Sequence, residues 1–249
     1  PLHHPFGEVG TAALAMEKAA AAAALDLPAF VFAPLPDEAP APAPVPLADG
    51  PVEELVPMLY GNITKGASTL GSAGIRVPGS AGETSEALEA SRQIPSLIMA
   101  DGPAGLRLRQ CYQADRATGE VYGAGVLGSL ENGFLEAPPR HEGADTYYQF
   151  CTAFPVGTAL AQSWDPELLT RVGRAVSREM DEFHVDLWLA PGMNSQRNPL
   201  CGRNFEYYSE DPLLTGTLAA AITAGVQGSG RHGVTLKHFA CNNQEDNRM

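Results

Sequence analysis

Short apolar runs alternate with longer amphipathic segments along the second half of the chain. The apolar runs lie at residues 96–100, 154–161, 186–191 and 233–238. Two of the amphipathic segments open on an Asp-Pro pair, at Asp165 and at Asp211, which is typical of a helix N-cap followed by proline in the first turn. We expect helices from these pairs to Phe183 and to Gln227, and a strand at each apolar run. The apolar stripe of the first helix consists of Leu168, Val172, Val176 and Met180.

Strands that alternate with helices predict βαβ units and therefore an α/β fold with a parallel sheet. A closed (β/α)8 barrel and an open doubly wound sheet both fit this pattern. Upstream, residues 53–60 predict a short helix, and the Gly-, Ser- and Thr-rich stretch that follows to residue 84 predicts a loop. Residues 102–150 are rich in glycine and are expected to be irregular.

The N-terminal fifth of the chain has a composition of its own. Six consecutive alanines at residues 19–24 predict a short helix. Seven of the 18 residues from 34 to 51 are proline, which lacks the amide donor and favours an extended, semi-rigid connector. We therefore expect residues 1–50 to be an Ala- and Pro-rich tail or linker from a preceding domain, and residues 51–249 to be the main folded unit.

Charge and composition exclude several classes of protein. The chain has 16 Lys and Arg against 29 Asp and Glu, a formal net charge of −13, whereas a nucleic-acid binder needs a basic face. The apolar stretches are much shorter than the roughly 20 residues that span a bilayer. We expect neither a nucleic acid nor a membrane as a partner. The four cysteines lie 40 to 50 residues apart without a CxxC pair, which predicts free thiols in a reducing compartment and so a cytoplasmic protein.

One motif suggests a nucleotide site, but its surroundings do not support it. Gly123, Gly125 and Gly128 have the spacing of the dinucleotide fingerprint GxGxxG. That fingerprint requires a strand before it and a helix after it, so that the helix N-terminus faces the pyrophosphate. Neither is predicted here, and we expect a loop. The histidines show no metal-ligand spacing, and no nucleophile elbow or P-loop is present.

Charged side chains gather where the predicted strands end. In a parallel sheet the C-terminal ends of the strands form the ligand face. A mixed set of Asp, Arg, Lys and His suits a neutral polyhydroxylated ligand, because each hydroxyl both donates and accepts, whereas a phosphorylated ligand favours Arg and Lys alone. The pattern therefore favours a sugar. The set comprises Asp101, Arg107, Arg197, Arg203, Lys237, His238 and Arg248.

Five longer motifs cover the same positions. They are Ala-Asp-Gly-Pro-Ala-Gly-Leu-Arg at 100–107, Phe-Pro-Val-Gly-Thr-Ala-Leu-Ala at 154–161, Leu-Ala-Pro-Gly-Met at 189–193, Asn-Pro-Leu-Cys-Gly-Arg-Asn-Phe-Glu-Tyr-Tyr-Ser-Glu-Asp at 198–211, and Lys-His-Phe-Ala-Cys-Asn-Asn-Gln-Glu at 237–245. In this order they resemble glycoside hydrolase family 3, in its β-glucosidase branch. The branch of β-N-acetylglucosaminidases carries Pro-Gly-His-Gly after the Lys-His pair, and this chain does not. Residues 66–84 resemble members whose two main domains come in reversed order, with the barrel last.

The resemblance implies a (β/α)8 barrel, of which residues 51–249 supply the N-terminal part, about the first four β/α units. It implies that the remainder comes from the same polypeptide or from a companion chain. An open half barrel leaves an unpaired edge strand and an unburied sheet face, both unfavourable for a free monomer. We therefore expect the chain to be part of a longer catalytic unit.

The resemblance also implies roles for individual residues. Asp101 is similar to the carboxylate that holds two hydroxyls of the terminal sugar. The residues similar to the other hydroxyl donors of that subsite are Arg107, Arg203, Lys237, His238 and Arg248. Glu206 and Glu210 are similar to residues that orient these donors from behind. No metal or organic cofactor is implied.

The implied reaction is hydrolysis of terminal non-reducing β-D-glucosyl residues with retention, through a covalent glycosyl-enzyme. The family's aspartate nucleophile and glutamate acid/base are both expected outside this chain. Two alternatives remain open. One is a β-xylosidase or arabinosidase of the same family, and the other is a non-catalytic sugar-binding fragment or inactive remnant.

Overall fold

The computed structural model describes residues 51–62, 74, 76–122 and 140–244. The chain divides into two units, Pro1–Asp49 and Gly50–Met249, and all described residues belong to the second. Four sequence expectations lie outside the described residues: the alanine helix, most of the proline-rich connector, the glycine motif at 123–128 and the site residue Arg248.

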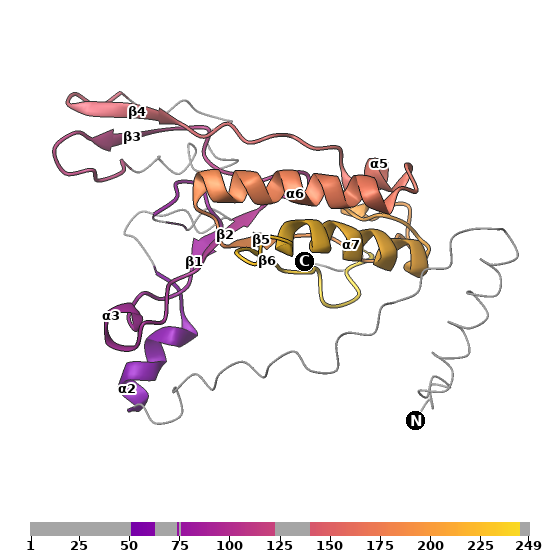
Figure 1. The fold of residues 1–249 in the computed structure, drawn as a ribbon, viewed down its shortest axis with the longest axis horizontal. Coiled ribbons are helices and arrows are strands. Elements are labelled where there is room, and N and C mark those ends of the chain that lie inside the picture. Colours follow the sequence, from indigo (N-terminus) through magenta and orange to yellow (C-terminus); the bar gives the residue numbers. More distant parts are fainter. Residues whose placement is uncertain (1–50, 63–73, 75, 123–139, 245–249) are drawn as a thin grey trace, which may run out of the picture. The chain divides into compact units, whose positions relative to one another are not determined.

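A four-stranded sheet forms the centre of the second unit (Figure 1). Its strands, in spatial order, are β1 (Gly82–Glu83), β2 (Ile98–Asp101), β5 (Leu187–Leu189) and β6 (Gly233–Val234). β2, β5 and β6 are parallel, as predicted. β1 pairs antiparallel with β2 in a stretch where the sequence predicted a loop. The sheet is therefore mixed, with a parallel part that aligns three C-terminal strand ends at one edge.

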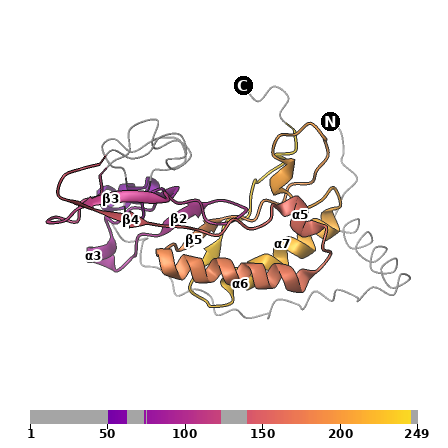
Figure 2. The same cartoon turned by 90° about the horizontal axis from the view of Figure 1, so that it is seen from above.

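Two long helices lie side by side against this sheet (Figures 1 and 2). α6 (Pro166–Phe183) and α7 (Pro212–Gln227) have the predicted bounds. Both predicted N-caps are confirmed: Asp165 Oδ1 accepts a hydrogen bond from the Leu168 amide at 3.0 Å, and Asp211 Oδ1 accepts one from the Leu213 amide at 2.7 Å. The local chemistry of these ends thus defines where each helix begins.

The buried stripe of α6 is displaced by about one residue from the predicted one. Val176 and Met180 are fully buried as expected, but Leu169 and Gly173 take the central places that we gave to Leu168 and Val172. Because α7 covers α6 on one side, the close approach of the two helices decides which stripe is innermost. Leu168 and Val172 pack at the margin of the core.

Besides β1, three further sequence expectations about strands differ from the structure. The apolar run 154–161 is not a strand, because residues Gly157–Ala161 form the short helix α5; a short apolar run does not by itself distinguish a strand from a buried helix. The last strand, expected at 233–238, has only two residues, and a single parallel bridge from Gly192 to Lys237 continues it. Residues 102–150 are not irregular throughout, since β3 (Cys111–Asp115) and β4 (Ala144–Tyr148) form an antiparallel pair.

The remaining elements are short. The helix expected at 53–60 is present as α2 (Val52–Leu55) continued by the 3-10 helix η1 (Val56–Leu59). α3 (Glu89–Arg92) precedes β2, and η3 (Asn204–Glu206) lies between β5 and α7. Within the described ranges, no helix has the length and apolar character needed to cross a lipid bilayer.

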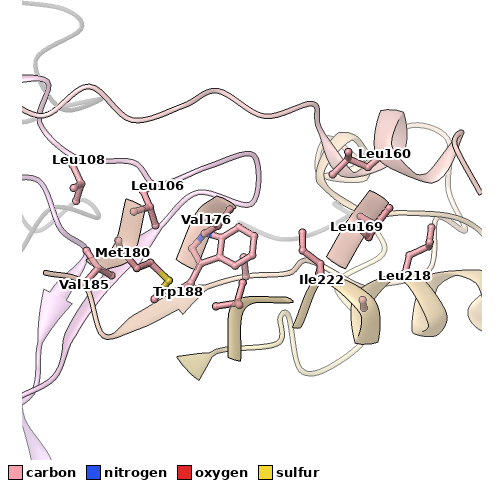
Figure 3. Packing of buried hydrophobic residues seen from close by; sticks show 14 of the residues in the cluster. Leu106, Leu108, Leu160, Leu169, Val176, Met180, Val185, Trp188, Leu218 and Ile222 are labelled. Carbon is pink, nitrogen blue, oxygen red and sulfur yellow. The ribbon is translucent and has the colours of Figure 1, made fainter. Parts of the chain in front are cut away.

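The hydrophobic core lies between the sheet and the two long helices (Figure 3). Trp188, in the middle of β5, is its largest fully buried side chain and lies close to Val176 and Met180 of α6. The indole Nε1 of Trp188 donates a hydrogen bond to the carbonyl oxygen of Gly102 at 2.9 Å. This bond satisfies the one polar group of the indole and ties the turn after β2 to the core.

The crossing of α6 and α7 depends on two glycines that face each other. A Cβ placed on Gly173 would collide with the Ile222 carbonyl of α7, and one on Gly225 would collide with the Thr170 carbonyl of α6. In contrast, a Cβ on Gly216 of α7 would meet no atom of another element.

We expect Gly173→Ala to destabilise the protein, because overpacking costs ~1–3 kcal/mol and outweighs the gain in helix propensity. The net loss should be about 1 kcal/mol in urea denaturation. Gly216→Ala is the matched control and should be neutral or stabilising by up to ~1 kcal/mol. Equal stability of the two variants would contradict this account of the helix crossing.

Candidate functional site

The turn after β2 presents Asp101 at the C-terminal edge of the sheet. Gly102 and Gly105 have φ values of 116° and 118°, which only glycine adopts readily. The Arg107 amide donates back to the Asp101 carbonyl at 2.8 Å, which closes the turn. A side chain on Gly105 would collide with the carbonyl of Thr152. The Asp-Gly-Pro-Ala-Gly-Leu-Arg motif therefore folds into a compact loop that fixes the direction of the Asp101 side chain.

The Asp101 carboxylate holds two cations. Lys237 Nζ donates to Oδ1 at 2.6 Å, and Arg107 Nη2 donates to Oδ2 at 2.7 Å. Burial raises the pKa of Asp101, but the hydrogen bond and charge of Lys237, together with the Gly102 amide and Arg107, outweigh it and leave the pKa lowered. Asp101 is therefore ionised at neutral pH, which suits a hydroxyl acceptor rather than an acid.

The turn around η3 brings Arg203 and Glu206 to the same edge. The Arg203 Nε donates to Glu206 Oε1 in an ion pair, and Glu206 is buried. Burial lowers the pKa of Arg203, whereas the hydrogen bond and charge of Glu206 raise it and prevail. Arg203 Nη2 lies 2.7 Å from Nε2 of His238. Glu206 is therefore placed to orient Arg203, although it lines the cavity rather than lying behind the donors.

Two side chains that sequence reasoning missed hold the η3 turn in place. The amide Nε2 of Gln196 lies 2.9 Å from both Thr158 Oγ1 and the Asn204 carbonyl oxygen, and 3.0 Å from the Tyr207 carbonyl oxygen. Thr158 Oγ1 in turn donates to the Asn204 and Tyr207 carbonyl oxygens at 2.9 and 3.0 Å. The position of Gln196 in the polar stretch after β5 is a sequence feature that could have indicated its role. Thr158 was overlooked because a buried strand was expected at 154–161.

His238 is held through both its backbone and its ring. The side-chain amide of Asn194 accepts from the His238 amide at 2.6 Å and donates to the His238 carbonyl oxygen at 3.0 Å. The ring contacts Arg203 through Nε2 and the Tyr207 hydroxyl through Nδ1, at 2.7 and 2.9 Å. Burial lowers the pKa of His238, and the neighbouring Arg203 and Lys237 lower it further against the opposing effect of Glu206 and Asp101.

A cavity of about 510 Å³ opens between these elements, within the range of small-molecule sites. Five charged side chains line it, together with the glycine-rich turn after β2, the start of α5 and Phe205. They are Asp101, Arg107, Arg203, Glu206 and Lys237. Acceptors and donors thus alternate around one hollow, as a polyhydroxylated ligand requires.

The structure gathers most of the predicted site residues, and two lie apart from it. Asp101, Arg107, Arg203 and Lys237 line the cavity, and His238 adjoins it through Arg203. Glu210 is exposed and is not part of the cavity wall, so the expected role of orienting the donors finds no support in its position. Arg197 also does not line the cavity.

Comparison with known proteins relates one segment of the chain to a family. Residues 139–248 match the model of the glycosyl hydrolase family 3 N-terminal domain. This part of the chain is similar to the N-terminal domain of glycosyl hydrolase family 3. The match includes α5, α6, β5, the η3 turn, α7 and the Lys-His pair.

Two curated relatives of the family 3 segment carry different names. Thermostable β-glucosidase B of Acetivibrio thermocellus is 44% identical over 156 residues, which are 63% of this chain and 17% of that protein. The exo-α-(1→6)-L-arabinopyranosidase of Bifidobacterium longum is 40% identical over 159 residues, 64% of this chain and again 17% of that protein. The chain therefore spans about a sixth of the length of these relatives.

A solved structure is also similar. β-Glucosidase 3B of Thermotoga neapolitana, solved in complex with glucose, superposes with a TM-score of 0.60 at 40% sequence identity. The superposition covers 79% of this chain and 23% of that one. The similarity in structure therefore extends beyond the 139–248 segment.

Asp101 makes the stability of the folded protein depend on pH in the acid range. Because its pKa is lowered on folding, the stabilisation is present above the ordinary carboxyl pKa of about 4 and is lost as the pH falls through the lowered value. We expect Asp101→Asn to remove this part of the pH dependence. Urea denaturation at a series of acid pH values measures it, and parallel curves for wild type and variant would contradict the assignment.

Proposed function

We propose that the polypeptide to which this chain belongs is a retaining β-glycosidase that hydrolyses terminal non-reducing β-D-glucosyl residues. The observation that carries the proposal is the cavity in which Asp101 faces Lys237, Arg107 and Arg203. The names of the β-glucosidases from Acetivibrio and Thermotoga support glucosides as the substrate class.

In this proposal the chain supplies the subsite that holds the terminal sugar. Asp101, ionised and steered by two cations, accepts hydrogens from two sugar hydroxyls. Arg107, Arg203 and Lys237 donate to sugar oxygens from the other walls of the cavity. His238, expected as a further donor, acts instead through Arg203, because both of its ring nitrogens have protein partners. Arg248, which lies outside the described residues, is proposed as a further donor. These bonds strengthen as the ring acquires oxocarbenium character, so they lower the barrier as well as bind.

The bond-breaking groups are proposed to lie in other parts of the polypeptide. A retaining enzyme needs a carboxylate that attacks the anomeric carbon and a carboxylic acid that protonates the leaving oxygen, ~5–5.5 Å apart. Water then releases the sugar from the covalent intermediate, with the second group acting as base. An aspartate and a glutamate outside this chain are proposed for these roles.

The architecture proposed for the complete unit is a (β/α)8 barrel. The parallel order β2-β5-β6 and the helix pair α6 and α7 support it. The rest of the barrel is proposed to come from the same polypeptide or from a companion chain, and residues 1–50 are proposed as a linker from a preceding domain. The free cysteines at 111, 151, 201 and 241 support a cytoplasmic location.

A pentopyranosidase is the second candidate, because one relative of almost equal similarity is named an arabinopyranosidase. The two sugars differ in the exocyclic hydroxymethyl group, which glucose has and arabinopyranose lacks, and in the configuration of the C4 hydroxyl.

A third candidate function, from a different class, is a sugar-binding module without catalysis. Side-by-side assays of the full-length polypeptide with 4-nitrophenyl β-D-glucoside and 4-nitrophenyl α-L-arabinopyranoside separate the first two, and glucose binding without turnover of either would favour the third.

We expect Asp101→Asn in the full-length polypeptide to lower kcat/KM for 4-nitrophenyl β-D-glucoside by roughly a hundredfold, about 3 kcal/mol of transition-state binding. The amide places a donor where one carboxylate oxygen accepts, so it can no longer hold both Lys237 and Arg107. The matched control is Asp145→Asn, which removes a half-exposed carboxylate on β4 that pairs with Arg116 at 2.8 Å. Control and wild type should be alike, and wild-type activity of Asp101→Asn would remove the basis of the proposed site.

A further inference from the structure

The ring of His238 has a hydrogen-bond partner on each nitrogen. Nε2 lies 2.7 Å from Arg203 Nη2, and Nδ1 lies 2.9 Å from the Tyr207 hydroxyl. The Asn242 side-chain amide donates to the same hydroxyl at 2.8 Å. Asn242, Tyr207, His238, Arg203 and Glu206 thus form one continuous chain of contacts that ends at the cavity wall.

The chemistry of the partners decides the protonation state of the ring. A guanidinium can only donate, so Nε2 must offer a lone pair to Arg203. A neutral imidazole carries one proton, which must then be on Nδ1. Nδ1–H then donates to the Tyr207 hydroxyl oxygen, because a phenol oxygen can accept a hydrogen bond. The four charged groups around the ring are Arg203, Lys237, Glu206 and Asp101.

The Tyr207 side chain, including its hydroxyl, is fully buried. The Tyr207 oxygen accepts from Nδ1–H, and the lone pair of Nε2 therefore points to Arg203. Glu206 accepts from the Nε edge of the same guanidinium. Arg203 is therefore held by an acceptor at two of its five N–H groups, and its plane is set relative to the cavity.

We propose that Tyr207 is a positioning residue: its buried hydroxyl accepts from Nδ1–H of His238 and so holds the ring with its Nε2 lone pair toward the Arg203 guanidinium at the sugar-binding cavity. Asn242 supports Tyr207 by donating to the hydroxyl from the other side. Tyr207 itself does not line the cavity, so it acts through His238 and Arg203. The consequence for sugar binding rests on the proposed function, whereas the tautomer does not.

The tautomer is measured on the sugar-free, full-length polypeptide labelled with 15N in its histidines. Long-range 1H–15N correlation spectra at neutral pH distinguish Nδ1–H, Nε2–H and doubly protonated rings, and the His238 signals are assigned by their loss in His238→Ala. We expect a neutral Nδ1–H ring. An Nε2–H or doubly protonated ring in the wild type would overturn the proposal. This spectrum needs no catalytic activity and decides the matter even if Tyr207→Phe does not fold.

The second arm compares two neighbouring buried tyrosines. Tyr207→Phe removes the acceptor that holds Nδ1–H, so the ring is free to turn away from Arg203, and we expect His238 to lose its single tautomer. Tyr208→Phe is the matched control, because Tyr208 is equally buried, belongs to the hydrophobic core and has no recorded hydrogen bond to another described residue through its hydroxyl. Its spectrum should match the wild type. Identical His238 spectra for the two variants would overturn the role of Tyr207.

The kinetic arm tests whether Tyr207 acts through His238. We expect Tyr207→Phe to lower kcat/KM for 4-nitrophenyl β-D-glucoside about tenfold, the effect of leaving one buried donor without its acceptor. In a His238→Ala background the same substitution should have no further effect, since the two residues act as one unit. Additive losses would overturn the proposal. If the wild type shows the Nδ1–H ring but no turnover, the proposed function fails while the hydrogen-bond order at His238 stands.

Discussion

The bond between Asp101 and Lys237 joins two strand ends that are 136 residues apart in the sequence. It exists because β2 and β6 flank β5 in parallel, so their C-terminal ends reach the same edge of the sheet. Each ion would be costly to bury alone, and together they form a pair that is partly open to the cavity. The order of the parallel strands is therefore the constraint on which the rest of the site depends.

Two backbone turns, rather than packed helices or strands, carry most of the charged side chains that line the cavity. The turn at 102–105 carries Asp101 and Arg107, and the η3 turn carries Arg203 and Glu206. The second turn has little regular structure of its own, and Gln196 and Thr158 satisfy its carbonyl groups instead. Partly buried side-chain amides and hydroxyls thus replace backbone pairing in holding this turn.

The directions of the hydrogen bonds also fix how the charged side chains of the site are oriented. Asp101 and Glu206 accept, Arg203 donates on two sides, and His238 accepts on one nitrogen while it donates on the other. The lowered pKa of His238 is consistent with a ring that stays neutral between two cations. Because every member has a partner, a single substitution changes the orientation of a neighbour as well as removing its own contact.

Local chemistry in the sequence determined the two long helices, whose Asp-Pro starts and bounds agree with the structure, and it determined which residue types meet at the strand ends. Only the tertiary structure decided that residues 157–161 form a helix, that a hairpin interrupts the glycine-rich stretch, and that Glu210 remains outside the cavity while Glu206 enters it. It also decided the parts played by Thr158, Tyr207 and Asn194. A cap or a proline acts on its own neighbours and can be read locally, whereas a hydrogen bond between distant segments depends on the strand order that folding imposes.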